Sequence, residues 1–448
     1  MRNFLVSARR LFGSLFKDGN TAWRIALGAF VLPLACVASQ ARSPSRPPAA
    51  SQSPIGPTNP SASAAATMGL PSGDKSILAA GARHTCEATH DGMIRCWGNN
   101  AQGQLGDGTT TGRLAPVGVV GFPKSDATIT GLAAGAKHTC VVLSGVEILC
   151  WGDNALGQLG NIEIGRASNV PVPVTHLPLS DSTTITAIAA GSQHTCIALS
   201  NGQMICWGSN SDNQLGGGWE KTPREPPLRV LGFPVGGDIV AIAAGDKHTC
   251  AAITNGRAYC WGSNANGQLG RASDDADDVL MPVILFPHSG EVTVNALAAG
   301  GDHSCAALSN REIYCWGSNS DGQLGSEIHA AQKVLANANA PRVPGHGNFA
   351  TALSAGKHHT CVAISTGQAF CWGADWEGQL GDGAALPSQE LRDPVRLPEM
   401  GIGIAMSSGG NHTCIASPLR GTFCWGENRE GQLGNGTTNP TLVPVRVH

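Results

Sequence analysis

His84-Thr85-Cys86-Glu87-Ala88-Thr89-His90-Asp91-Gly92-Met93-Ile94-Arg95-Cys96-Trp97-Gly98 is the stretch on which the organisation of this 448-residue chain depends. Its pattern, a His-Thr/Ser-Cys triplet followed by Cys-Trp-Gly, occurs seven times, and in every copy the two cysteines are ten positions apart. The triplets begin at His84, His138, His194, His248, His303, His359 and His412. A repeat of this regularity indicates one structural unit used seven times.

The spacing of the cysteines predicts a β-hairpin closed by a disulfide. Symmetric pairing places Cys86 opposite Cys96 and leaves a three-residue loop that ends on Gly92, where such loops favour a left-handed glycine. Directly opposed residues on antiparallel strands have α-carbons roughly 4.5 to 5.5 Å apart, which is within reach of a disulfide. The sequence therefore predicts the pairs Cys86-Cys96, Cys140-Cys150, Cys196-Cys206, Cys250-Cys260, Cys305-Cys315, Cys361-Cys371 and Cys414-Cys424.

Two other roles for these cysteines stay open at this point. They could be buried free thiols, or they could bind a metal, although the chain has no Cys-x-x-Cys motif. Fifteen cysteines favour an oxidising compartment, and the pairing scheme uses all but Cys36.

Residues 1–41 have the pattern of an export signal. Five Arg or Lys residues precede or flank an apolar run over residues 25–36, and Ser39-Gln40-Ala41 offers small residues for cleavage. Three alternatives remain: a twin-arginine signal at Arg9-Arg10, lipidation at Cys36, and an uncleaved membrane anchor. Residues 42–74 are rich in Ser, Pro and Ala without apolar periodicity, which predicts a disordered spacer.

Composition narrows the class of protein. High glycine (59 residues), few charged residues (14%) and two tyrosines are typical of a repeat β protein. Removal of residues 1–41 takes away five basic residues and one acidic residue, so the net charge moves from -3 to -7. This acidic balance argues against nucleic acid as the main partner.

Residues 75–448 predict seven units of four short strands. Each unit has an apolar segment before a glycine, the two arms of the cysteine hairpin, and a last strand such as Pro444-Val445-Arg446-Val447. Consecutive apolar residues, as in Val141-Val142-Leu143, indicate that both faces of each sheet are covered. Seven copies without a divergent capping unit favour a closed ring, so we expect an all-β, seven-bladed β-propeller with four-stranded antiparallel blades. Whether the last strand completes its own blade or the first one stays open.

The repeats resemble those of the regulator of chromosome condensation family. The shared elements are Gly-x-x-His-Thr, Trp-Gly-x-Asn-x-x-Gly-Gln-Leu-Gly and Pro-x-x-Val, which recur over residues 75–448. The resemblance implies a seven-bladed propeller; members act in guanine nucleotide exchange and chromatin binding, in β-lactamase inhibition by a secreted bacterial relative, or as interaction modules. This chain has an export signal, paired cysteines in each repeat and no long insertion resembling a GTPase-engaging wedge. It therefore resembles a secreted bacterial-type member.

The residues repeated in every unit are interpreted as scaffold. A ring spaces the seven triplet histidines too far apart for one metal ion, the repeated tryptophans are expected between blades, and the repeated Gln residues are expected to order loops. We predict no catalytic residue, cofactor or metal. Function is expected where the repeats differ, and the candidate binding residues are Trp219 and Trp376, since exposed tryptophan is a frequent interface anchor. The acidic group Asp274, Asp275, Asp277 and Asp278 binds either calcium or a basic partner or, preferably, is a solvated loop.

These observations favour a monomeric propeller, exported or tethered to the cell surface, that binds a protein or a glycan through its non-repeat loops. Its expected location is extracellular, periplasmic or at the cell surface, with membrane contact only through the N-terminal segment. The first alternative is an inhibitor that occludes the active site of an enzyme. Guanine nucleotide exchange and a hydrolase or lyase built on the ring are further alternatives.

Overall fold

The computed structural model describes residues 76–89, 91–124, 127–180, 182–217, 224–234, 237–271, 281–283, 292–325, 347–388, 394–398, 405–417 and 419–448. The chain divides into two compact units, Met1–Pro57 and Thr58–His448, and all described residues belong to the second. The expected export signal (1–41) and spacer (42–74) lie outside the described residues, and so do Cys36 and the boundary at residue 75. Within the described ranges, no helix is long and apolar enough to span a bilayer.

The described chain forms seven small antiparallel sheets, or blades, each built from strands that follow one another in sequence. Blades 1 and 2 contain β1 (Ile77–Ala80), β2 (His84–Ala88), β3 (Ile94–Gly98), β4 (Arg113–Gly118), and β5 (Ile129–Ala134), β6 (His138–Leu143), β7 (Glu147–Asp153), β8 (Ala167–Pro173). Blades 3 and 4 contain β9 (Ile185–Ala190), β10 (His194–Leu199), β11 (Met204–Gly208), β12 (Arg224–Arg229), and β13 (Ile239–Ala244), β14 (His248–Ile253), β15 (Ala258–Gly262), β16 (Met281–Pro282). Blades 5, 6 and 7 contain β17 (Val294–Ala299), β18 (His303–Leu308), β19 (Ile313–Gly317); β20 (Ala350–Ala355), β21 (His359–Ile364), β22 (Ala369–Gly373); and β23 (Ala405–Ser408), β24 (His412–Ser417), β25 (Gly421–Gly426), β26 (Thr441–Arg446).

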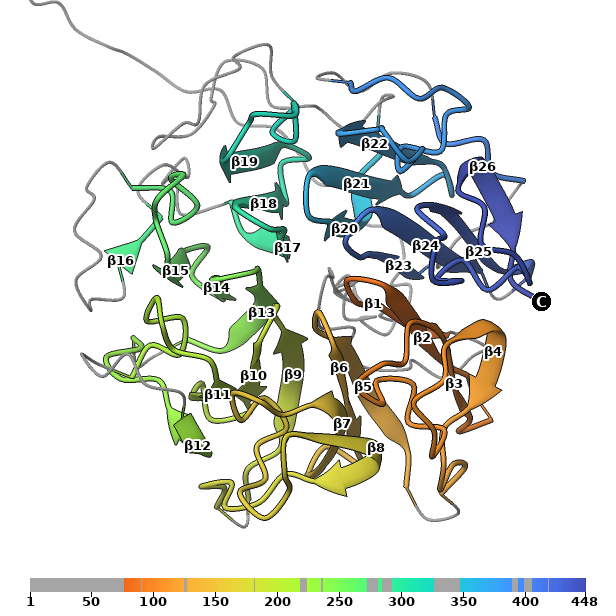
Figure 1. Cartoon of the computed structure of the whole chain (residues 1–448). Coiled ribbons are helices and arrows are strands. Elements are labelled where there is room, and N and C mark those ends of the chain that lie inside the picture. Colours follow the sequence, from red (N-terminus) through yellow and green to blue (C-terminus); the bar gives the residue numbers. More distant parts are fainter. Residues whose placement is uncertain are drawn as a thin grey trace, which may run out of the picture. The chain divides into compact units, whose positions relative to one another are not determined.

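The blades are arranged around a common axis as a propeller (Figure 1). The first strand of each blade lies innermost, and β4, β8, β12 and β26 lie at the outside. The all-β, seven-bladed architecture is confirmed, but four strands are present in only five blades of the described part. In blade 6 an isolated bridge between Gly373 and Ser388 and a bond from Val395 N to Ala369 O (2.9 Å) replace a regular fourth strand. In blade 5 the corresponding segment, residues 326–346, falls outside the described ranges.

The ring closes without exchange of strands between blades. β26 pairs with β25, with Cys424 opposite Val445, so the last strand completes its own blade. Blade 7 meets blade 1 through direct bonds instead, among them Ala80 N to Ser407 Oγ at 2.9 Å. The question that the sequence left open is answered by this arrangement.

The predicted hairpin register and disulfides are confirmed. Cys86 lies opposite Cys96, and Ala88 lies opposite Ile94. Gly92 closes the hairpin with φ of 78°, in the left-handed region that the three-residue loop requires. All seven predicted pairs form disulfides with α-carbons 4.1 Å apart.

The hydrophobic core lies in the seams, which are the interfaces between neighbouring blades. In the seam between blades 1 and 2, Ile94 and the Cys86-Cys96 disulfide of blade 1 belong to one buried cluster with Leu149 and Trp151 of blade 2. Because each blade contributes to two seams, both of its faces are apolar, as the consecutive hydrophobic residues predict. We call the end of the propeller where the second and third strands connect the hairpin end, and the end that carries the Gly-Gln-Leu-Gly loops the loop end.

Candidate functional site

The seven repeated histidines form a ring of hydrogen bonds that crosses every seam. Each Nε2 lies 2.8 to 2.9 Å from the hydroxyl of the Thr or Ser in the triplet of the next blade. The pairs are His84-Thr139, His138-Thr195, His194-Thr249, His248-Ser304, His303-Thr360, His359-Thr413 and, across the closure, His412-Thr85. The ring therefore ties each blade to the next one.

The hydrogen-bond partners of the hydroxyl determine which nitrogen of the histidine carries a hydrogen. In the seam between blades 1 and 2, Thr139 Oγ1 donates to the backbone carbonyl of Gln104 (3.0 Å), and Trp151 Nε1 donates to the same oxygen (2.9 Å). Because the hydroxyl has only one proton to donate, it must accept from His84, so His84 Nε2 carries a hydrogen. Corresponding pairs of bonds recur in five further seams. In the seam between blades 6 and 7, Trp425 Nε1 donates to Gln379 O, and Thr413 Oγ1 lies 3.3 Å from Ser408 Oγ.

Burial keeps all seven imidazoles neutral. It lowers the pKa of His84, His194, His303 and His359 to about 3, with neighbouring histidines adding to the effect, and the pKa of His138, His248 and His412 to about 4. Their Nδ1 atoms have no hydrogen-bond partner in the described chain. A β-carbon on the glycine three residues earlier would lie 2.1 to 2.5 Å from the Cε1 atom of the ring, so the glycine backbone covers this side of the imidazole. The histidines are thus enclosed and are unsuited to proton transfer with a solvent-borne substrate.

The other repeated residues are also scaffold. Trp97 and its equivalents are buried in the seams, as expected. The side chain of Gln104 accepts from Gln102 N and donates to Asn99 Oδ1, both at 2.9 Å, so it orders its loop as predicted. The sequence did not reveal that the partner of each histidine is a hydroxyl group of the next blade.

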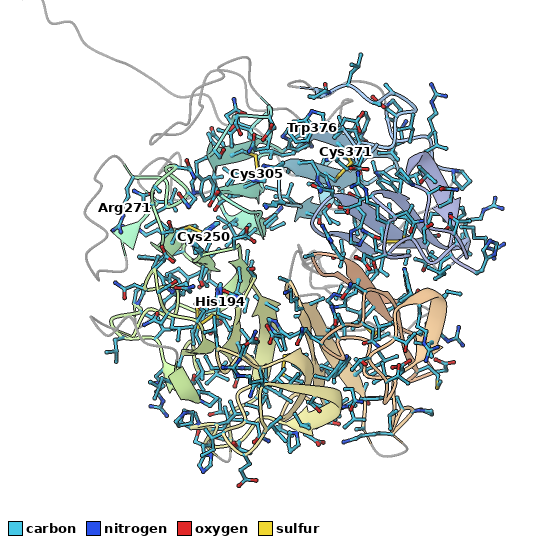
Figure 2. All side chains as sticks on the ribbon, in the orientation of Figure 1. His194, Cys250, Arg271, Cys305, Cys371 and Trp376 are labelled. Atoms are coloured by element: carbon cyan, nitrogen blue, oxygen red, sulfur yellow. A yellow bond between two sulfur atoms is a disulfide. The ribbon has the colours of Figure 1, made fainter. Side chains whose placement is uncertain are left out.

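Of the two candidate binding residues, only Trp376 is described, and Trp219 lies outside the described residues. Trp376 is 59% exposed at the loop end of blade 6, and Figure 2 shows it beside Cys371 of the same blade. Its indole lies 6.4 Å from the ring of His358, and the adjacent Glu377 pairs with Arg429 of blade 7 at 2.6 Å. A large apolar side chain is therefore held at the surface by an ordered polar loop.

Beside Trp376 is an acidic residue that sequence reasoning missed. Asp375 takes the place of an asparagine that stands at this point of the motif in the other six repeats. In blade 1, Asn100 Oδ1 accepts from Leu105 N (2.9 Å) while its Nδ2 donates to the carbonyl oxygens of Thr109 and Thr111 (both 3.1 Å). The departure from the repeated motif was the signal that could have identified it.

The second oxygen of Asp375 lacks the role that the asparagine amide has. Oδ1 accepts from Leu380 N at 2.9 Å, whereas Oδ2 is buried and has no hydrogen-bond partner among the described atoms. Burial raises the pKa of Asp375 to about 7, Asp382 adds to the rise, and the backbone amides of Leu380 and Leu386 oppose it. The carboxyl is thus a poor substitute for an amide whenever it is ionised.

We expect Asp375→Asn to raise the free energy of unfolding by about 1 to 3 kcal/mol at pH 8, because it removes a negative charge that burial disfavours. The folded-state pKa is raised, so ionisation of the wild-type residue weakens the fold as pH increases from about 4 to about 7. The gain should therefore shrink from pH 8 to pH 5.5. Urea unfolding of both proteins across this range measures it.

Asp212→Asn is the matched control, since Asp212 occupies the corresponding loop of blade 3 with a partly exposed side chain. It should change stability by less than about 0.5 kcal/mol at every pH. A gain for Asp375→Asn that is the same at pH 5.5 and pH 8 would show that ionisation of Asp375 is not the cause.

A small cavity lies at the propeller axis, where the innermost strands end. It has a volume of about 180 Å³ and is lined by the Ala, Gly and Ser residues that end the innermost strands, together with Asp246 and Lys357. Burial raises the pKa of Asp246, and the Lys357 ammonium opposes the rise. Elsewhere in the described ranges, no group of three or more His, Cys, Asp or Glu residues is placed to hold a metal ion. The acidic group at residues 274–278 lies outside those ranges.

This fold and its repeated motif define a class of β-propeller. Residues 58–415 match the RCC1-like domain, and residues 421–448 match the regulator of chromosome condensation (RCC1) repeat. The chain therefore belongs to the RCC1-like domain family, as the repeats indicated.

Curated relatives span most of the chain. The ultraviolet-B receptor UVR8 of Arabidopsis thaliana is 30% identical over 367 residues, covering 80% of this chain and 78% of the receptor. A secretion-regulating guanine nucleotide exchange factor of Bos taurus is 30% identical over 389 residues, covering 81% of this chain and 80% of that protein. Among solved structures, Prp20p of Saccharomyces cerevisiae superposes with a TM-score of 0.70 at 22% identity, covering 80% of this chain and 86% of Prp20p. Human WBSCR16 superposes with a TM-score of 0.65 at 22% identity, over 80% of this chain and 94% of that one.

Proposed function

We propose that this chain is an exported or surface-tethered scaffold, not an enzyme, that binds a protein partner through non-repeat loops at the loop end of the propeller. The observation that carries the proposal is Trp376, which is 59% exposed although the described tryptophans of the repeated motif are buried in the seams. Tryptophan contributes disproportionately to protein interfaces because it buries a large apolar area at a small cost in conformational entropy.

The disulfides support export. Seven formed disulfides are unusual in a reducing compartment, whereas secreted proteins commonly carry them. The basic and apolar pattern of residues 1–41 points the same way. Together they favour a periplasmic, extracellular or cell-surface location.

Proteins of the same fold support a protein partner. Yeast RCC1 (Prp20) has been solved bound to Kap60, and Prp20p has been described with its binding properties to Gsp1p and histones. At 22% identity these structures share the fold with this chain, and the identity of a partner does not carry over. That proteins of this fold bind other proteins supports a protein partner for this chain.

The loop around Trp376 is organised as an interface anchor would be. The Glu377-Arg429 pair joins the loops of blades 6 and 7, and His358 of the preceding turn lies beside the indole and pairs with Asp321 of blade 5 at 3.1 Å. An apolar centre surrounded by charged groups is the usual anatomy of a transient interface. We therefore place the centre of the proposed binding surface at Trp376.

Trp376→Ala should reduce capture of the partner from the native extracellular or periplasmic fraction at least tenfold, since truncation of a central tryptophan typically costs about 2 kcal/mol or more. Leu419→Ala is the matched control, because Leu419 is 80% exposed at the opposite, hairpin end. Quantitative pull-down with the full chain, followed by affinity measurement on the partner recovered, gives the comparison. Equal recovery by wild type and Trp376→Ala would exclude this surface. Recovery of an enzyme that is inhibited on binding would replace the scaffold proposal with the inhibitor alternative.

A further inference from the structure

The seam between blades 7 and 1 differs from the other seams at the hairpin end. Its buried apolar cluster is reduced to Leu78, Trp97, Cys414, Ala416, Cys424 and Leu433. Leu78, Trp97 and Leu433 belong to the part of the seam nearer the axis and the loop end, where the repeated motif is preserved. The deficit in apolar side chains is therefore confined to the hairpin end.

Polar side chains occupy the positions that are apolar in the seam between blades 1 and 2. The strand register makes Glu87, Thr89 and Arg95 of blade 1 equivalent to Val141, Leu143 and Leu149 of blade 2. On the opposite side of the seam, Thr422 of blade 7 is equivalent to Ile94 of blade 1. In the seam between blades 1 and 2 the apolar set is fully buried, and it consists of Val141, Leu143, Leu149 and Ile94.

The exchange leaves a cavity of about 440 Å³ at the hairpin end. Its lining includes Ser76, Glu87, Thr89, Arg95, Thr422 and Arg446. A volume in this range is sufficient for a small-molecule ligand. The cavity is distinct from the proposed protein-binding surface, because that surface is at the loop end.

One carboxyl group is already held in place within this cavity. Thr422 Oγ1 donates to Glu87 Oε1 at 2.7 Å, which joins blade 7 to blade 1 across 335 residues of sequence. Burial raises the pKa of Glu87, and its hydrogen bonds to Thr422 and Ser76, followed by the charge of Arg95, oppose the rise. Glu87 is thus a positioned acceptor for a ligand hydroxyl.

Two guanidinium groups outnumber the one acidic side chain in the described lining of the cavity, which also includes His448. Arg95 and Arg446 both line it and are exposed to solvent, and each guanidinium group offers a planar set of N–H donors. Arg95 interacts with Glu87, whereas no described residue forms an ion pair with Arg446. Glu87 is the one acidic side chain in the described lining, so it balances at most one of the two cations.

We propose that this cavity binds a small hydroxylated carboxylate, the chemistry of a uronic-acid sugar residue. The planar guanidinium groups of Arg95 and Arg446 pair with the ligand carboxylate, a geometry for which arginine is suited. Glu87 and the hydroxyls of Ser76, Thr89 and Thr422 exchange hydrogen bonds with the ligand hydroxyls. An apolar ligand is excluded because it would remove water from the guanidinium groups of Arg95 and Arg446 without offering them a hydrogen-bond acceptor.

Glucuronate and glucose test the proposal, because they differ at C6 in the carboxylate that the arginines are assigned to bind. Isothermal titration of the full chain should show binding of glucuronate and at least tenfold weaker binding of glucose. Arg95→Ala and Arg446→Ala should each weaken glucuronate binding at least tenfold. Arg257→Ala, at the hairpin end of blade 4 and outside the cavity, should leave it unchanged.

A triple variant keeps the proposal testable if an alanine variant folds poorly. Glu87→Val, Arg95→Leu and Thr422→Ile together restore the side chains of the apolar seam, so this protein should fold, resist heat better than wild type and lose glucuronate binding. Equal affinity for glucose and glucuronate, equal effects of Arg95→Ala and Arg257→Ala, or binding that survives in the triple variant would overturn the proposal. Absence of any glucuronate binding to the folded wild type would also overturn it, without bearing on Trp376.

Discussion

Between pH 7 and pH 5 the propeller is expected to lose roughly 10 kcal/mol of its free energy of unfolding, and to unfold in this range. The cause is the ring of seven buried histidines, whose pKa values lie at about 3 or 4 in the folded protein. Each histidine accounts for up to about 2 kcal/mol of this loss, because the unfolded histidine, with a pKa near 6.5, takes up a proton in this range and the folded one does not. A typical domain has only about 5 to 15 kcal/mol of stability to lose.

The free energy of unfolding falls with decreasing pH because the pKa values of the histidines are lower in the folded protein than in the unfolded one. The contribution of the ring is fully present above about pH 6.5, declines as pH falls, and is exhausted only when the folded histidines themselves titrate. Glu87, Asp246 and Asp375 act in the opposite sense, because their pKa values are raised in the folded protein. Three such carboxyls offset part of the loss from seven histidines, so we expect a net loss.

Urea unfolding at half-unit steps from pH 7.5 to pH 5 measures the loss as a slope. Uptake of several protons on unfolding is expected near pH 5.5, and His248→Gln should lower that number by about one, since an amide can donate to Ser304 without titrating. Leu419→Ala, which changes an exposed side chain at the hairpin end of blade 7, should leave the slope unchanged. A slope of one proton or fewer in the wild type would contradict the neutral, enclosed state of the histidines.

The sequence predicted the features of the structure that recur in every blade. A separation of ten positions between Cys86 and Cys96, with Gly92 at the turn, defines one register for a hairpin, and the structure pairs the two cysteines in this way in all seven copies. The signals are local, so propensity and spacing are sufficient. The closed ring follows from the number of equivalent units that must cover one another's faces.

The features specific to this chain could not be predicted in the same way, because they depend on contacts between distant residues. Glu87 and Thr422 are 335 positions apart, and only ring closure brings them together. The sequence did contain a weaker signal, since Glu87, Arg95 and Asp375 each depart from the residue type of the other repeats. Such departures indicate where to look, whereas the cavity, the burial and the missing hydrogen-bond partner of Asp375 Oδ2 are properties of the folded chain.

Reduction of the seven disulfides is expected to lower stability by up to about 2.5 to 3 kcal/mol each, which in total exceeds the stability of a typical domain. This is an upper limit, because hairpin strands remain neighbours in part of the unfolded ensemble. The reduced chain should therefore be unable to hold the propeller at 37 °C, and circular dichroism after reduction in urea and removal of the urea measures this. Refolding of the reduced, alkylated chain to the native spectrum would contradict it.

Because the disulfides lie in the seams, we also expect them to be reduced slowly in the native protein. The sulfurs lie in the seams on cysteines that are at most 5% exposed, and in several seams they contact the hydroxyl of the next blade, as Cys250 Sγ contacts Ser304 Oγ at 3.7 Å. A thiol reductant must reach the sulfur it attacks, so native protein should be reduced slowly and protein in urea rapidly. Thiol titration of exported, unreduced protein in urea should detect at most one thiol per chain, that of Cys36 where it is retained. Several reactive thiols, or equally fast reduction with and without urea, would show that the hairpins are not closed within the seams and that the blades depend on packing alone.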